Sequence, residues 1–87
     1  MADVVIYTKG YCPFCARAKA LLGARGVGFT EHEVTHDPDR FAEMVDRSGR
    51  RTVPQVFIDG APVGGSDDLA ALEASGGLDR LLHRAPA

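Results

Sequence analysis

The sequence has little of several features that define other classes of protein. It has only two cysteines, no long hydrophobic segment, and a formal net charge of −2 from 10 basic and 12 acidic residues. The charged residues are scattered, so we expect no attraction to nucleic acid or to an anionic membrane surface. A chain of 87 residues buries enough surface for one core. We therefore expect a single domain over residues 1–87, with its core at about 3–83.

The beginning of the chain, MADVVIYTKG, contains Asp3 and only a short apolar run. A signal-peptide core or a membrane span needs a longer run, so we expect a cytoplasmic protein outside the membrane. Two cysteines are also too few for the disulfide framework of a small secreted protein. In a reducing cytosol, a close pair of cysteines is typically metal-binding or redox-active. The function of the chain therefore depends on Cys12 and Cys15.

The first part of the chain predicts a strand, a helix and a second strand. A β-branched and aromatic run favours a strand at 4–8, which Gly10 ends. Good helix formers behind Pro13 predict a helix at about 13–24, and loose alternation predicts a strand at 27–34. Two strands joined by a helix in this way are parallel, with a right-handed crossover.

The remaining chain predicts a helix, a hairpin and two further helices. Asp37 and Pro38 are typical of a helix start, and Gly49 ends that helix. Strands at 55–59 and 62–64 flank an Asp-Gly-Ala turn of the kind that closes antiparallel hairpins. We expect Ser66 to cap a third helix, and leucines near the C-terminus to form a short fourth one. The predicted order βαβ-α-ββ-α gives an α/β fold with a four-stranded mixed sheet flanked by helices.

The placement of Cys12 favours a reactive thiolate. It lies just before the first turn of the predicted helix, where unpaired amide groups present positive potential, and Lys9 is close in sequence. Cys15, one helical turn later, is placed to attack a mixed disulfide on Cys12, which is the role of a resolving thiol. Pro13 fixes its φ angle without the loss of a hydrogen bond, so the pair can be held together with little strain.

Three other roles for the cysteines are conceivable from the sequence. A structural disulfide across so short a loop would constrain little of the unfolded chain, and a reducing cytosol opposes it. A zinc site needs more ligands, and the remaining candidates are His32, His36 and His83. An iron–sulfur cluster shared by two chains, each giving Cys12, is a further alternative. A CxxC pair that follows a strand and opens the helix of a βαβ unit favours redox chemistry over these, and we predict no metal site.

Three motifs resemble those of the dithiol glutaredoxins of the small bacterial type. They are TyrThrLysGlyTyrCysProPheCys at 7–15, ThrValPro at 52–54 and GlyGlySerAspAsp at 64–68. The resemblance implies a thioredoxin-like fold, which agrees with the predicted order of elements. It also implies a glutathione-dependent thiol–disulfide oxidoreductase that reduces protein disulfides and glutathione–protein mixed disulfides. In that family glutathione is a co-substrate, and no tightly bound cofactor is expected.

The resemblance assigns roles to the cysteines and to the ThrValPro loop. Cys12 is the implied nucleophile and Cys15 the implied resolving thiol. In the family the proline of this loop is cis, and the residue before it pairs its backbone with the cysteinyl part of glutathione. The resemblance therefore implicates Thr52 and Val53 in binding and makes Pro54 cis.

The GlyGlySerAspAsp segment is implied to hold the γ-glutamyl end of glutathione. Its glycines, Gly65 among them, let a ligand approach the backbone closely, and amide groups at a helix start can receive a carboxylate. By resemblance, the amides of Ser66 and Asp67 bind the carboxylate and the Asp67 side chain lies near the ammonium group. A bare capping role for Ser66 is the alternative, and the two roles can coexist.

The glycine carboxylate of glutathione needs a cation. Lys9 matches the family's lysine before the CxxC pair. On the second helix, where the family often has a polar or basic residue, this sequence has Phe41, so Arg40 or Arg51 is left to supply the additional charge. Which of these two arginines contacts the carboxylate is open at this point.

Aromatic residues surround the predicted nucleophile. Tyr11 and Phe14 flank Cys12, and Phe14 replaces the tyrosine that is commonest in this motif, so a hydroxyl is lost and an aromatic wall remains. Tyr7 lies in the first predicted strand, and we expect it in the core.

The implied partners are glutathione and disulfide-containing or glutathionylated proteins, with ribonucleotide reductase among the candidates. Glutathione reductase and NADPH are implied as indirect partners, and we expect a monomer. One alternative is an electron donor reduced by thioredoxin reductase, against which Lys9 and the 64–68 segment argue. The other is a glutathione-ligated iron–sulfur cluster carrier, against which the stiffness that Pro13 gives the loop argues.

Overall fold

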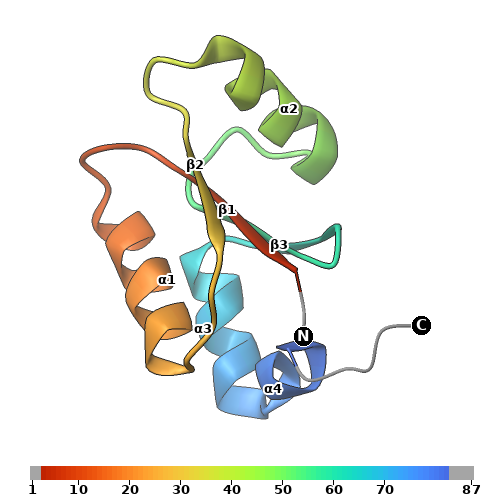
Figure 1. Cartoon of the computed structure of the whole chain (residues 1–87). Helices are drawn as coiled ribbons and strands as arrows, with labels where there is room; N and C mark the ends of the chain where they lie inside the picture. Colours follow the sequence, from red (N-terminus) through yellow and green to blue (C-terminus); the bar gives the residue numbers. More distant parts are fainter. Residues whose placement is uncertain (1–2, 83–87) are drawn as a thin grey trace.

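Four strands form one mixed sheet in the order β2-β1-β3-β4 (Figure 1). The computed structural model describes residues 3–82. Strand β1 pairs in parallel with β2 and antiparallel with β3, and β3 pairs antiparallel with β4. The elements in chain order are β1 (Val4–Thr8), α1 (Pro13–Ala24), β2 (Thr30–Glu33), α2 (Pro38–Ser48), β3 (Gln55–Ile58), β4 (Ala61–Gly64), α3 (Ser66–Ser75) and α4 (Gly77–Leu82). The predicted order, including the short fourth helix, is confirmed.

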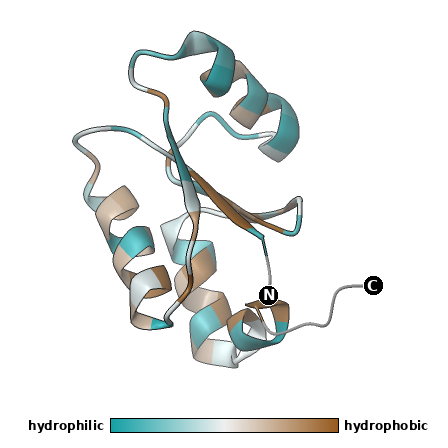
Figure 2. Cartoon of the chain, viewed as in Figure 1, coloured by the Kyte–Doolittle hydropathy of each residue, from teal (hydrophilic) through white to brown (hydrophobic). Residues whose placement is uncertain are grey.

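Helices cover both faces of this sheet (Figure 1). Because side chains alternate along a strand, β1 and β3 each contribute to two cores. The larger core lies against α1, α3 and α4 and contains Val4, Ile6, Ala18, Leu22, Val56, Ile58, Leu69, Leu78 and Leu82. The smaller core lies against α2 and contains Tyr7, Val34, Met44 and Phe57, so the prediction of Tyr7 as a core residue is confirmed. Figure 2 shows the contrast between the hydrophobic central strand and the mostly hydrophilic surface of α2.

The helix ends follow the capping signals of the sequence. The Asp37 side chain accepts a hydrogen bond from the Arg40 amide at 3.1 Å, which satisfies one unpaired donor at the start of α2. Helix α2 ends at Gly49, whose φ of 72° lies in the left-handed region that favours glycine. Both ends of this helix are as predicted.

Strand β2 is shorter than predicted. The prediction placed a strand at 27–34, but pairing with β1 begins only at Val5↔Thr30 and ends at Glu33. The Val27 amide donates to the Leu22 carbonyl oxygen at 3.1 Å, so this part of the chain completes the turn after α1. Val27 and Phe29 pack against the larger core without pairing to a strand, and their hydrophobicity produced the longer prediction.

The hairpin bounds also differ slightly from the prediction. Strand β3 ends at Ile58, one residue early, because Asp59 and Gly60 form the turn with φ angles of 52° and 82°. Positive φ at both central residues is typical of a type I′ turn. Strand β4 begins at Ala61, which pairs with Ile58 instead of belonging to the turn.

The cap of α3 corrects another prediction. Ser66 was expected to cap this helix, but Gly65 is the N-cap residue and Ser66 is the first helical residue. The Asp68 carboxylate reaches back and accepts a hydrogen bond from the Gly65 amide at 3.0 Å. The Asp68 carboxylate, three residues after the N-cap, therefore satisfies the N-cap amide, as the acidic residue of a capping box does.

The helices of this fold are short. No helix within residues 3–82 is long and apolar enough to cross a membrane. His83, a candidate zinc ligand in the sequence, lies outside the described residues.

Candidate active site

Cys12 occupies the N-cap of α1 with an extended backbone. Its sulfur accepts a hydrogen bond from the Cys15 amide at 3.2 Å and lies 3.8 Å from the Val53 carbonyl oxygen. The side chain is half-buried, so a substrate sulfur can approach it. Amide groups at the first turn of a helix stabilise negative charge. Cys12 thus lies at the start of α1, with the Cys15 amide directed at its sulfur and room for a substrate beside it.

Cys15 has a different environment one turn further along α1. It is 1% exposed. Burial, followed by its hydrogen bond with Cys12, raises the pKa of the Cys15 thiol to about 11, although the Lys9 backbone amide opposes this shift. At neutral pH Cys15 is therefore a protonated thiol, and the two cysteines are chemically unequal.

The loop at 52–54 lies directly beside Cys12. The Val53–Pro54 peptide bond is cis, as the resemblance implied. The buried Gln55 side chain donates to the Thr52 carbonyl oxygen at 3.0 Å and to its hydroxyl oxygen at 3.2 Å. These bonds order the loop, so its backbone groups have a fixed position next to the Cys12 sulfur. The supporting role of Gln55 was not predicted from the sequence.

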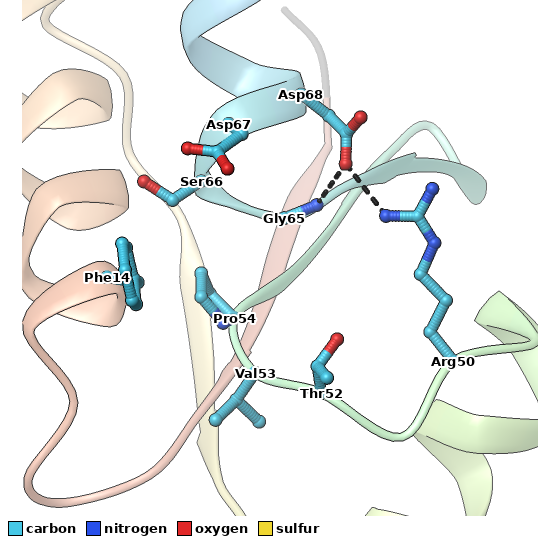
Figure 3. Close-up of a pocket in the computed structure, with 9 residues that line it drawn as sticks. All are labelled: Phe14, Arg50, Thr52, Val53, Pro54, Gly65, Ser66, Asp67 and Asp68. Atoms are coloured by element: carbon cyan, nitrogen blue, oxygen red, sulfur yellow. Dashed lines mark hydrogen bonds and ion pairs between the residues drawn. The ribbon is translucent and has the colours of Figure 1, made fainter.

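A pocket of about 210 Å³ lies between this loop and the start of α3, with Phe14 of α1 in its lining (Figure 3). Its lining residues are Phe14, Arg50, Thr52, Val53, Pro54, Gly65, Ser66, Asp67 and Asp68. All of these except Arg50 and Asp68 were predicted as site residues. The two motifs that the resemblance linked to glutathione thus form facing walls of one pocket.

Lys9 and Arg51 lie on the ring of Phe41, outside this pocket lining. The Lys9 ammonium is 5.2 Å from the ring centroid, and the Arg51 guanidinium carbon is 5.4 Å from it. Both are cation–π distances, so two cations contact the same aromatic ring. Arg40 instead forms an ion pair with Glu43 at 3.0 Å. The structure thus places Arg51, and not Arg40, on the same ring as Lys9.

The aromatic residues that flank Cys12 are exposed. Tyr11 is 105% exposed and Phe14 is 51% exposed, and within residues 3–82 they are the exposed large hydrophobic side chains. The Arg17 guanidinium carbon lies 5.4 Å from the Phe14 ring centroid. Tyr11 does not line the pocket, so the structure places it at the surface around the nucleophile instead.

The remaining histidines do not gather around the cysteines. The His32 ring lies in β2, 5.2 Å from the Tyr7 ring. Within residues 3–82, no group of three or more His, Cys, Asp or Glu side chains is arranged to hold a metal ion.

Arg50 and Asp68 are the site residues that sequence reasoning missed. Asp68 carried a usable signal, because an acidic residue three positions after the N-cap Gly65 fits the spacing of a capping box. Arg50 carried none, since a basic residue after a helix-terminating glycine is ordinary at the surface. Its place in the pocket follows only from the tertiary fold.

Comparisons with known proteins identify the family. A family model described as Glutaredoxin matches residues 4–63. Glutaredoxin 3 of Escherichia coli (strain K12) is 57% identical over 82 residues, which cover 94% of this chain and 99% of that protein. A glutaredoxin of Neisseria meningitidis serogroup B is 51% identical over 84 residues, covering 95% of this chain and 99% of that protein.

Solved structures agree. The solution structure of glutaredoxin from Brucella melitensis has a TM-score of 0.86 at 53% identity, covering 100% of this chain and 95% of that one. A buckwheat glutaredoxin–glutathione complex has a TM-score of 0.85 at 32% identity, covering 93% of this chain and 76% of that one. The fold is therefore thioredoxin-like, as expected. With its CysProPheCys pair, the chain belongs to the glutaredoxin family and is a glutathione-dependent thiol–disulfide oxidoreductase.

Proposed function

We propose that Cys12 is the nucleophile that removes glutathione from protein thiols. Its thiolate attacks the glutathione sulfur of a protein–glutathione disulfide, so a new disulfide joins Cys12 to glutathione and the protein leaves as a thiolate that takes up a proton. A second glutathione thiolate then attacks the glutathione sulfur on Cys12. Glutathione disulfide leaves and the Cys12 thiolate returns. Glutathione reductase and NADPH would return the glutathione disulfide to glutathione.

Cys15 enters the reaction when the substrate is a protein disulfide. Cys12 attacks one substrate sulfur and releases the other as a thiolate. Cys15 then loses its proton and attacks the Cys12 sulfur, which releases the second substrate thiolate and closes a Cys12–Cys15 disulfide. Two electrons have passed to the substrate. Two molecules of glutathione reduce the enzyme again and become glutathione disulfide.

In this proposal glutathione binds across the pocket. The Val53 backbone pairs with its cysteinyl part, and the amides of Ser66 and Asp67 take the γ-glutamyl carboxylate, with the Asp67 side chain near the ammonium group. Lys9 and Arg51 take the glycine carboxylate. The short distance from Val53 to Cys12 supports this arrangement, because a cysteinyl sulfur paired at Val53 would lie next to the nucleophile.

The partners follow from the same site. We propose that the exposed Tyr11 and Phe14 rings contact the protein substrate around its disulfide, and that ribonucleotide reductase is among the candidate substrates. A reducing compartment such as the cytoplasm keeps Cys12 and Cys15 in the thiol state that the reaction needs. The proposed working form is a monomer, since one chain supplies every group named above.

The observation that carries the proposal is the inequality of the cysteines: Cys12 is half-exposed at a helix start, and Cys15 is buried with a pKa raised to about 11. The test measures reduction of a glutathionylated peptide by the wild type, Cys12→Ser and Cys15→Ser. Cys12→Ser should abolish turnover. Cys15→Ser should retain it and lose only the reduction of protein disulfides. Turnover by Cys12→Ser would refute the assignment, and failure of glutathione to reduce the oxidised wild type would point to thioredoxin reductase as the electron source.

A further inference from the structure

Arg50 and Asp68 form an ion pair that spans the two walls of the pocket (Figure 3). The Arg50 Nη1 atom lies 2.8 Å from Asp68 Oδ2. The same oxygen accepts the hydrogen bond from the Gly65 amide at 3.0 Å. Arg50 leads into the loop at 52–54, and Asp68 lies in the first turn of α3. One carboxylate oxygen therefore ties the loop to the N-cap of the helix.

The glycines beside this pair show how closely the two walls approach. Gly64 has a φ of 117°, and a Cβ atom there would collide with the Asp68 carboxylate. A Cβ atom on Gly65 would lie 3.3 Å from the Pro54 carbonyl oxygen, which is tighter than usual packing. The carboxylate thus fills the space that Gly64 leaves open. The position of α3 relative to the loop is set by direct contact.

The charge of Asp68 matters for the amides next to it. The hydrogen bond from Arg50, followed by that from the Gly65 amide, lowers the pKa of the Asp68 carboxyl, so this group is ionised at neutral pH. Ser66 and Asp67 immediately precede it in the same helical turn. Without Arg50, an unpaired negative charge would stand beside the amides that are proposed to receive a carboxylate of glutathione, and would repel it.

We propose that Arg50 is a positioning residue for glutathione, acting through Asp68. It holds the start of α3 against the loop at 52–54 and neutralises the Asp68 carboxylate, so that the Ser66 and Asp67 amides are aligned and free to bind an anion. Arg50 itself need not touch glutathione. This inference rests on the proposed function, because it assigns Arg50 to the proposed γ-glutamyl subsite.

The expected effect is modest. The Arg50 and Asp68 side chains are 53% and 44% exposed, and exposed ion pairs contribute little because water screens them. We expect loss of Arg50 to raise the KM for a glutathionylated peptide about twofold to fivefold. The kcat at saturating substrate should stay near the wild-type value, since the cysteines are untouched.

The test compares Arg50→Met, Asp68→Asn and the double variant with the wild type, with Arg80→Met as a matched control on α4. The double variant removes both charges, so its KM should lie closer to the wild type than that of Arg50→Met. Added NaCl should weaken glutathione binding by the wild type. In Arg50→Met the same salt should raise KM less, because it also screens the repulsion from Asp68.

Several outcomes would overturn the inference. An unchanged KM in Arg50→Met would do so. The inference would also fail if the KM of the double variant rose by the product of the increases in Arg50→Met and Asp68→Asn. If Arg50→Met fails to fold, as shown by its thermal unfolding curve, Arg50→Lys replaces it and should show a smaller rise in KM. Failure here is distinct from failure of the proposed function, which would appear as an inactive wild type or an active Cys12→Ser.

Discussion

The backbone amide of Cys15 donates a hydrogen bond to the sulfur of Cys12 at 3.2 Å, so the buried Cys15 contacts the half-buried Cys12 before any disulfide forms between them. Cys15 thus contributes to the thiol–disulfide reaction in two ways. Its amide stabilises negative charge on Cys12, and its own thiol stays protonated until a mixed disulfide forms. The short spacing of the CysProPheCys pair is what allows both.

The first prediction concerns how fast the Cys12–Cys15 disulfide closes. Only the thiolate of Cys15 attacks, and burial, the largest cause, raises its pKa to about 11. Loading of Cys12 with glutathione does not remove that burial. Starting from the Cys12–glutathione disulfide, the rate of release of glutathione should therefore rise about tenfold per pH unit between about pH 7 and 9. Acid quenching followed by mass spectrometry measures it.

Cys15→Ser is the control for this experiment, because its Cys12–glutathione adduct should persist at every pH. A rate that is flat over this pH range would mean that the Cys15 thiol is already ionised near neutrality. That result would contradict the burial argument.

The second prediction separates two arginines. Arg51→Met should raise the KM for glutathione about twofold to fivefold, since it removes one of two cations on the Phe41 ring. Arg40→Met, the same change on α2, should have little effect because Arg40 is paired with Glu43. Steady-state kinetics at low ionic strength measures both. Equal effects of the two variants would remove Arg51 from the proposed site.

The third prediction concerns Gly64. Alanine at this position should lower the free energy of unfolding by about 1–3 kcal/mol, because a φ of 117° strains any residue with a Cβ atom and the Asp68 carboxylate fills the space. For a domain of this size, that corresponds to a fall in Tm of roughly 4–8 °C per kcal/mol. Gly28→Ala is the matched control, since a Cβ atom there has no atom within 4 Å. Similar Tm values for both variants would be contrary to expectation.

The fourth prediction concerns the contact of the sheet with α2. The buried Tyr7 hydroxyl donates to Glu43 and accepts a hydrogen bond from Arg47 at 3.1 Å. Tyr7→Phe leaves these charged groups without that partner and should destabilise the fold by about 1–2 kcal/mol in urea unfolding. Tyr11→Phe makes the same change on a fully exposed ring and should leave stability unchanged. No difference between the two would show that the hydroxyl contributes nothing.

The sequence was informative where local signals and tertiary structure agree. Pro13, Asp37 and Gly49 mark helix ends by their own backbone chemistry, so those bounds were predictable. Val27 and Phe29 gave a wrong strand bound because hydrophobic packing and strand pairing produce the same alternation in a sequence.

Some site residues were likewise predictable from local sequence, and others meet only through the tertiary fold. Cys12 and Cys15 could be read from their spacing and their place before a helix, while the cis bond at Pro54 followed only from the family resemblance. Arg50 and Asp68 are 18 residues apart, and no local pattern indicates that they meet. Their contact depends on the hairpin, which brings β4 and the start of α3 back beside the loop.

The β3–β4 hairpin also places its turn far from the reacting cysteines. Strand β3 leaves the cysteines at Gln55 and reaches Asp59 and Gly60 at the far end of the sheet, before β4 returns to Gly64. The β3–β4 pairing shifts its register between Val56, which pairs with Gly64, and Phe57, which pairs with Pro62. A dye, tag or inserted peptide at Asp59–Gly60 would therefore lie at the end of the sheet opposite the Cys12 sulfur. A label at this turn should leave the reaction of the enzyme undisturbed.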